Sequence, residues 1–263
     1  MEKRLIARGL LAGAIAAVLA FLFARLCAEA VISRAIAFED GRTDAENAHG
    51  VHEHGVELFT RGVQANIGLG FGVLIFGVAM GALFAVLFCV VYGRVRDVGP
   101  RPLSLLLAFA AFVAVYLVPF LKYPPNPPAV GQSDTIGGRT GWYLVMVLTS
   151  VVLTGAAVWL SGRLVTRFGT WNGRLLATAA CLVAIVVVME LLPTVDETPQ
   201  PLRDTAGTII YPGFPADVLY EFRLLSLGTQ LLLWATIGLV FGALTGRLFR
   251  EPAERRKAMS VSP

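Results

Sequence analysis

The chain has 263 residues, of which 56% are hydrophobic and only 15% are charged, and its mean hydropathy is +0.70. These values exclude an ordinary soluble domain, in which charged residues make up about a quarter of the chain, and they predict a membrane protein. The net charge of +4 does not indicate a nucleic-acid partner, because the basic residues stand in short groups between apolar stretches. Cys27, Cys89 and Cys181 lie in three separate apolar stretches, so no C-x-x-C pair exists for redox or zinc chemistry.

Six apolar stretches bounded by charged residues predict transmembrane helices. A spanning helix needs about 20 mostly apolar residues. In chain order, the stretches lie near residues 9–32, 62–93, 102–121, 140–162, 175–192 and 224–246. We therefore expect an all-α fold, a polytopic helical membrane bundle over residues 1–250, followed by a basic cytoplasmic tail over residues 251–263. The fifth stretch is the shortest, because Glu190 and Pro193 close it early.

Glycines at four-residue spacing predict where helices approach one another closely. Three such sets occur: Gly68 with Gly72, Gly77 with Gly81, and Gly238 with Gly242 and Gly246. Small residues on one helix face let two backbones come near each other, so these sets indicate helix packing and do not by themselves indicate a pore. Pro119 predicts a kink just before the end of the third stretch.

The positive charges between the apolar stretches predict the orientation in the membrane. The N-terminal segment, the second and fourth loops and the C-terminal tail contain fourteen lysines and arginines, whereas the alternate loops contain seven. Because cytoplasmic loops are enriched in these residues, both termini are expected in the cytoplasm, which agrees with an even number of spans. The protein is predicted to be a multi-pass protein of the cell (plasma or inner) membrane.

An alternative for the first stretch is a cleaved secretory signal. Lys3, Arg4 and Arg8 precede an apolar centre, and Ala28-Glu29-Ala30 resembles an A-x-A cleavage site. Arg25 lies close to that site and favours an uncleaved anchor. In either case, the loop that follows is expected outside the cell membrane.

All the histidines of the chain, His49, His52 and His54, fall within six residues of the first outer loop, near residues 33–61. Neutral imidazole is a good ligand for divalent transition-metal ions, and a carboxylate such as Glu53 can complete the shell. These four residues are the predicted metal-capture site. The first and last outer loops each carry six acidic residues, which raise the local cation concentration. The alternative is that the histidines are only solvated, as in other short histidine-rich segments.

Two carboxylates near the predicted membrane boundary are candidates for passing the metal inward. Glu29 lies four residues after Arg25, so the two side chains can also neutralise each other on one helix face. Glu190 lies at the outer end of the fifth stretch and can either reach the interface or receive a cation from the loop. Glu29 and Glu190 are therefore predicted transfer residues, with simple charge pairing and interfacial placement as the alternatives.

The sequence contains none of the short motifs that would indicate an enzyme. There is no H-E-x-x-H, no G-x-S-x-G and no G-x-x-x-x-G-K-[ST] nucleotide loop. We therefore predict no catalytic residue, no resident cofactor and no ATP-driven motor within this chain. The energy for any transport is expected from an ion gradient, a counter-ion or a partner protein.

Two segments outside the apolar stretches resemble the CbtA family of proposed cobalt transporter subunits. The first runs from Leu121 to Gly131, with the sequence KYPPNPP, and continues through Asp134-Thr135-Ile136 and Arg139-Thr140. The second runs from Leu191 to Gly228 and includes FPADVLYEFR. The histidine loop also fits, so the resemblance covers nearly the whole chain. It implies five spans, cobalt uptake connected to cobalamin synthesis, and a small single-span partner subunit, CbtB, that also bears histidine.

The predicted function is that of a subunit of a divalent transition-metal uptake transporter, with cobalt as the metal that the resemblance implies. The expected partners are a divalent metal ion, the lipid bilayer and the CbtB-like subunit, with no nucleic acid. Since such a site would bind Ni²⁺ or Cu²⁺ at least as tightly as Co²⁺, the residues alone do not name the metal. The alternative is a membrane scaffold or regulatory subunit that holds a partner and transports nothing.

Overall fold

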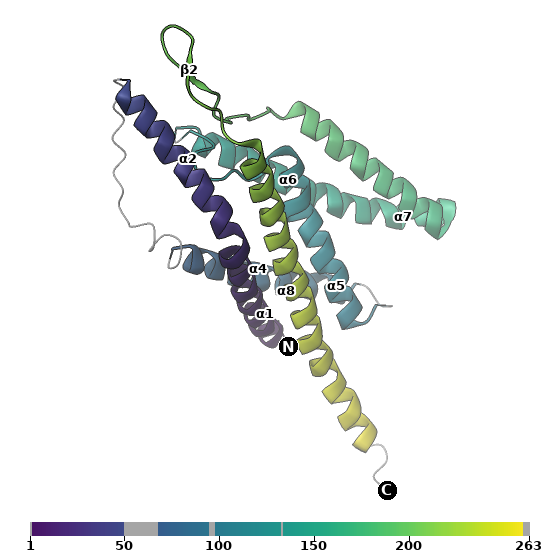
Figure 1. Ribbon diagram of the computed structural model, residues 1–263. Helices are drawn as coiled ribbons and strands as arrows, with labels where there is room; N and C mark the ends of the chain where they lie inside the picture. The colour runs from purple at the N-terminus through teal and green to yellow at the C-terminus, as the bar shows by residue number, and fades with distance from the viewer. Residues whose placement is uncertain (1, 50–67, 95–97, 133, 260–263) are drawn as a thin grey trace. The chain divides into compact units, whose positions relative to one another are not determined.

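The computed structural model of the chain describes residues 2–49, 68–94, 98–132 and 134–259, and these are almost entirely helical (Figure 1). Five helices among the described residues are long and apolar enough to cross a membrane: Glu2–Ala48, Gly70–Tyr92, Pro100–Lys122, Ile136–Leu191 and Ala216–Leu248. The predicted all-α, polytopic membrane fold is confirmed. The number of crossings and the cytoplasmic position of both termini stay predictions.

The first two helices are continuous. Helix α1 (Glu2–Phe23) passes through a π-helical segment, Ala24–Ala28, into α2 (Glu29–Ala48). The expectation that an outer loop begins near residue 33 was wrong, because residues 33–48 are helical. Val31, Ala35 and Phe38 are buried at helical spacing, and Arg42 Nε lies 3.0 Å from Glu46 Oε1 one turn later. An apolar face and an i,i+4 ion pair therefore extend the helix, although its other faces are charged.

The third helical stretch contains a π-helical segment just before Pro119, the residue at which a kink was predicted. Helix α5 (Pro100–Ala111) is followed by a π-helical segment, Phe112–Leu117, and then by the short α6 (Val118–Lys122). Proline has no backbone N–H and its ring crowds the carbonyl group four residues earlier, so the preceding turn widens. The buried Pro119 therefore accounts for the change in helical pitch at this point.

Helix α7 (Ile136–Leu191) contains both the fourth and the fifth predicted stretches. Its backbone is not helical at Gly169, where φ is 80° and ψ is 168°. The two legs on either side of this residue fold back on each other, as Figure 1 shows. A Cβ atom on Gly173 would lie 2.5 Å from the backbone nitrogen of Val165, so the return leg depends on glycine at that position. Within the part of the chain that the structure describes, the fourth and fifth predicted stretches thus share one helix, α7.

The chain divides into two compact units, and the first consists of Met1–Cys27, Glu57–Phe112 and Leu227–Pro263. In this unit, α1 packs on α4 (Leu69–Tyr92) through facing glycines. A Cβ atom on Gly13 would overlap the carbonyl oxygen of Gly77, and one on Gly9 would overlap that of Gly81. The predicted close approach at Gly77 and Gly81 is confirmed. The structure shows no such approach at Gly72, where no atom of the described residues lies within 4 Å of a Cβ position.

The remaining glycine set lies in the C-terminal part of α8 (Ala216–Met259), which packs on α5 in the same unit. A Cβ atom on Gly238 would lie 2.6 Å from Ala108 Cβ, and one on Gly242 would lie 3.2 Å from Ser104 Cβ. The Ser104 hydroxyl donates a hydrogen bond of 2.8 Å to the carbonyl oxygen of Gly238. The prediction that these glycines form a packing face is therefore confirmed.

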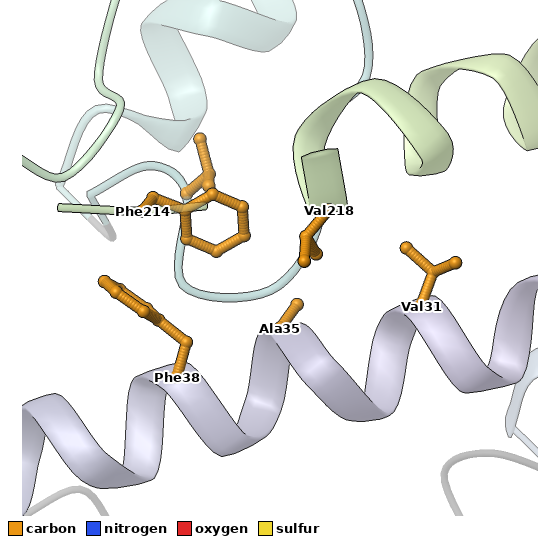
Figure 2. Packing of buried hydrophobic residues seen from close by; sticks show 6 residues of the cluster. Val31, Ala35, Phe38, Phe214 and Val218 are labelled. Carbon is orange, nitrogen blue, oxygen red and sulfur yellow. The ribbon is translucent and has the colours of Figure 1, made fainter. Parts of the chain in front are cut away.

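The second unit consists of Ala28–Val56 and Val113–Ser226. It contains α2, α6, α7, the beginning of α8 and a hairpin of two short antiparallel strands, β1 (Leu202–Arg203) and β2 (Ile209–Tyr211). One buried cluster joins α2 to the loops and to the start of α8, and Figure 2 shows it. The cluster consists of Val31, Ala35, Phe38, Val130, Phe214 and Val218. A second cluster, Val118, Met146 and Ile185, joins α6 to both legs of α7.

Candidate functional site

His49 is the one predicted metal ligand that the structure describes. It is the exposed residue that ends α2, and its backbone N–H donates to the carbonyl oxygen of Glu46 over 3.1 Å. The other three predicted ligands, His52, Glu53 and His54, lie outside the described residues. The four-ligand site therefore stays a prediction, with its first member placed at the end of a helix.

The ring of His49 makes a local hydrogen bond that bears on metal binding. Its Nδ1 atom lies 2.8 Å from the carbonyl oxygen of Ala45. A neutral imidazole that donates Nδ1–H to this carbonyl carries its free lone pair on Nε2. Metal-bound histidines commonly use this arrangement, in which one ring nitrogen is anchored and the other coordinates. The backbone of α2 thus supports the tautomer that a metal ligand needs.

The charge around the end of α2 also favours a cation. Glu39, Asp40 and Asp44 are exposed on its last turns, and Glu46 is paired with Arg42. The unsatisfied carbonyl groups at a helix C-terminus add a partial negative charge. Arg42 also donates from NH1 to the carbonyl oxygen of Gln200 over 2.8 Å. The positive charge of Arg42 is therefore engaged, and the excess of carboxylates remains.

The two predicted transfer residues occupy different elements. Glu29 is the half-buried first residue of α2, and Glu190 is exposed in the last turn of α7. Across the described part of the chain, no three His, Cys, Asp or Glu side chains stand close enough together to hold a metal ion. The structure does not gather Glu29, Glu190 and His49 into one such group, so their roles in transfer stay predictions.

A polar cluster in the second unit joins the loop that contains Glu197 to the stretch from Gln132 to Arg139, where α7 begins. Glu197 accepts a hydrogen bond of 2.9 Å from the backbone N–H of Gln132, and its Oε2 atom lies 3.3 Å from Arg139 Nε. Arg139 NH2 donates to the carbonyl oxygen of Gln132 over 3.1 Å. Hydrogen bonding by Thr135 and by the Gln132 N–H, with a smaller effect of the Arg139 charge, lowers the pKa of Glu197. These hydrogen bonds therefore favour the ionised form of Glu197 in the folded protein.

A neighbouring contact joins the proline-rich segment, residues 122–128, to the beginning of α8. Arg223 NH2 donates a hydrogen bond of 2.9 Å to Asn126 Oδ1. The hydroxyl of Tyr123 donates to the carbonyl oxygen of Pro193 over 2.8 Å. Asp196 is stabilised in its charged form, because hydrogen bonding from Thr198, aided by the Arg223 charge, lowers its pKa. These bonds join the two segments that resemble the CbtA family.

These contacts surround an open cavity of about 480 Å³ in the second unit. Its polar lining includes two guanidinium groups, three phenol groups, an amide and a hydroxyl group, and it includes no carboxylate. The lining residues that carry these groups are Arg139, Arg223, Tyr116, Tyr123, Tyr143, Asn126 and Thr140. The cavity chemistry thus differs from that of the acidic end of α2.

The sequence analysis did not identify this cavity as a site. The proline-rich segment and the residues around Arg223 were identified only as stretches that resemble a family. The available signal was that resemblance: Tyr123, Asn126, Arg139 and Arg223 all lie in the stretches that carry it. The structure shows that these residues meet around one cavity.

The apolar helices and the polar segments that connect them define a polytopic α-helical membrane protein. Over residues 2–246, the chain matches the family model described as probable cobalt transporter subunit (CbtA). The chain therefore belongs to the CbtA family, and the predicted resemblance is confirmed. No curated protein and no solved structure matches the chain. Family membership and the apolar helices identify a multi-pass membrane protein and a transporter subunit.

Proposed function

We propose that this chain is the metal-capturing subunit of a divalent-cation importer, and that Co²⁺ is its physiological cargo. Capture takes place on the extracytoplasmic side, at the segment that begins with His49 and continues through His52, Glu53 and His54. The observation that carries this proposal is the place of His49. It is exposed at the end of α2, with Nδ1 turned to the Ala45 carbonyl group, and it begins the segment that contains every histidine of the chain.

Electrostatics supports capture at this end of α2. A divalent cation is attracted by the exposed carboxylates of the last helical turns and by the helix C-terminus. Neutral imidazole nitrogens then replace water molecules of the hydrated ion. A single exposed imidazole binds weakly, so the proposal requires His52 and His54 to act together with His49. Glu53 supplies an oxygen ligand and reduces the net charge of the complex.

The ligand set does not itself select cobalt. Affinity at a nitrogen and oxygen site rises from Co²⁺ through Ni²⁺ to Cu²⁺, so selectivity must come from geometry or metal supply. The family assignment to cobalt is the reason for naming Co²⁺ as the cargo. Glu29 and Glu190 are proposed to take part in the subsequent inward transfer. A small single-span membrane subunit of the CbtB type is the proposed partner.

The test is uptake of ⁵⁷Co by whole cells that express this chain together with its partner subunit. Replacement of His49, His52 and His54 by alanine should abolish uptake at limiting cobalt while leaving the amount of protein in the membrane unchanged. The matched control is Asn47→Ala, because Asn47 is exposed in the last turn of α2 and has no imidazole. Undiminished uptake by the triple variant at limiting cobalt would show that the histidine segment does not capture the metal.

A second measurement separates capture from the later steps. Purified protein in detergent should bind Co²⁺ in equilibrium dialysis, and the triple histidine variant should lose this binding. Glu29→Gln and Glu190→Gln should leave equilibrium binding unchanged but slow uptake, since both residues are proposed to act after capture. If either glutamine variant takes up cobalt at the rate of the unmodified protein, that residue has no role in transfer.

A further inference from the structure

The cavity of about 480 Å³ in the second unit has the chemistry of an anion site. A volume of this size is in the range of small-molecule sites, about 300–1,000 Å³. Its polar lining combines two permanently charged guanidinium groups with hydroxyl and amide donors, and no carboxylate faces the space. A bare divalent cation is disfavoured there, because both formal charges in the lining are positive.

Arg223 has unused hydrogen-bonding capacity at this cavity. Its NH2 group donates to Asn126 Oδ1 over 2.9 Å. Its Nε atom is buried and has no hydrogen-bond partner among the residues that the structure describes. A buried donor without a partner is destabilising, so such groups usually point to a ligand or a water molecule. A guanidinium group binds a carboxylate or phosphate through two parallel N–H donors.

Arg139 supplies a second positive charge, but it is already engaged on its other side. Its Nε atom is paired with Glu197 at 3.3 Å, and its NH2 group donates to the carbonyl oxygen of Gln132. Asp196 contributes a smaller attraction to Arg223 from outside the lining. The two carboxylates therefore partly neutralise the arginines, and neither belongs to the lining of the cavity. The charge that is left facing the space belongs mainly to Arg223.

The walls of the cavity are largely aromatic and apolar. Tyr116 lines it from the π-helical segment before α6, Phe120 from α6 and Tyr143 from α7. Tyr123 and Pro124 line it from the proline-rich segment. Aromatic rings and proline pack well against an apolar body, and tyrosine hydroxyl groups can also donate to an anion. The lining thus suits a ligand with a charged head and an apolar part.

We propose that this cavity binds an organic oxyanion, a carboxylate or phosphate group carried on an apolar body, with Arg223 as its principal contact. The ligand is either a free organic anion or the phosphate group of a membrane lipid, since both present the same chemistry to the arginine. This site is separate from the histidine segment and does not depend on the proposed capture of metal there.

The test uses the full chain, purified and delipidated in a neutral detergent, with two probes. Isothermal titration calorimetry measures binding of phenylphosphate, with phenol as the uncharged comparison. Native mass spectrometry measures retention of added phosphatidylglycerol, with diacylglycerol as the comparison that lacks a phosphate group. Saturable binding of phenylphosphate alone identifies a free anion as the ligand. Retention of phosphatidylglycerol identifies a lipid.

Three variants decide whether binding takes place in this cavity. Arg223→Gln should weaken binding at least about tenfold, as expected for loss of one charge-assisted contact. Thr140→Trp should have a comparable effect, because Thr140 lies exposed at the cavity and a larger side chain would fill the space. The matched control is Arg203→Gln, since Arg203 is an exposed arginine of β1 outside the cavity lining.

Two results would overturn the proposal. The first is that the unmodified protein binds neither phenylphosphate nor phosphatidylglycerol. The second is that the probe binds to Arg223→Gln or to Thr140→Trp as tightly as it binds to the unmodified protein. If Arg223→Gln does not fold, the comparison between Thr140→Trp and Arg203→Gln decides the question, because both substitutions change exposed residues.

Discussion

Truncation of Phe38 to alanine should destabilise the second unit by about 4 kcal/mol and loosen the end of α2 from the β1–β2 segment. Phe38 is 6% exposed, and its ring packs against that of Phe214 (Figure 2), with ring centroids 4.9 Å apart. The ring centroid of Tyr211 lies 5.3 Å from that of Phe38. Removal of about 150 Å² of apolar contact at roughly 25 cal/mol per Å² gives about 4 kcal/mol. This agrees with the range of about 3–5 kcal/mol for Phe→Ala in a packed core.

Two measurements on detergent-solubilised protein test this value. The thermal midpoint should fall by about 8–16 °C, given about 2–4 °C per kcal/mol for a chain of this size. Backbone hydrogen exchange should accelerate over residues 202–214. The matched control is Phe71→Ala, because Phe71 is 63% exposed within the chain and should lose little protein packing. Equal shifts for the two variants, or unchanged exchange at residues 202–214, would refute the role of Phe38.

Further predictions concern a helix crossing, an ion pair and a strained turn. Gly13→Leu should lower the thermal midpoint, because overpacking reduces the free energy of unfolding by about 1–3 kcal/mol or more. Gly72→Leu should leave the midpoint unchanged, because a neighbouring backbone blocks a side chain at Gly13 and not at Gly72. The pKa of Glu197 in the folded protein lies below its ordinary value of 4.5. The ionised Glu197 therefore stabilises the protein above pH 4.5, and this contribution is lost as the pH falls through the lowered pKa. Glu197→Gln should make the thermal midpoint less dependent on pH in the acid range, as measured in a pH series. Ala129 has a φ of 68°, so Ala129→Gly should be neutral or stabilising by up to about 1 kcal/mol, and Ala129→Val should destabilise the protein in the same thermal assay.

The membrane-spanning helices could be predicted because their signal is local. Apolar length alone identified the regions of all five long helices, and four-residue glycine spacing identified the faces at Gly77 and Gly238. The same spacing failed at Gly72, because spacing shows that a close approach is sterically allowed and does not show that another helix is present. A glycine forms a close helix contact only where a second helix lies against it. The spacing of glycines within one helix cannot identify that second helix.

Residues 33–48 show why a charged segment was mistaken for a loop. Hydropathy averages over all faces of a helix, so the charges of α2 concealed the buried stripe of Val31, Ala35 and Phe38. A search for apolar residues that recur with a period of 3.6 residues would have found this stripe. The correction matters for the site, because it places His49 at the end of a regular helix and explains the hydrogen bond to Ala45.

The cavity could not be predicted from the sequence, because its walls come from distant segments. Asn126 and Arg223 are 97 residues apart, and Gln132 and Glu197 are 65 residues apart. No local period or spacing relates such positions. The resemblance to the CbtA family marked the segments as a set, but it did not indicate that they enclose a space lined by arginine and tyrosine.

The second unit thus offers two environments of opposite charge. The end of α2 carries exposed carboxylates and an imidazole, which favour a divalent cation, whereas the cavity presents Arg223 and Arg139, which favour an anion. A single bare metal ion cannot be stabilised by both, so metal and oxyanion should bind as separate ligands. Arg223→Gln should consequently leave equilibrium Co²⁺ binding unchanged, and the triple histidine variant should still bind the oxyanion. Loss of both ligands in either variant would instead indicate one coupled site, in which the oxyanion enters as the counter-ion of the metal.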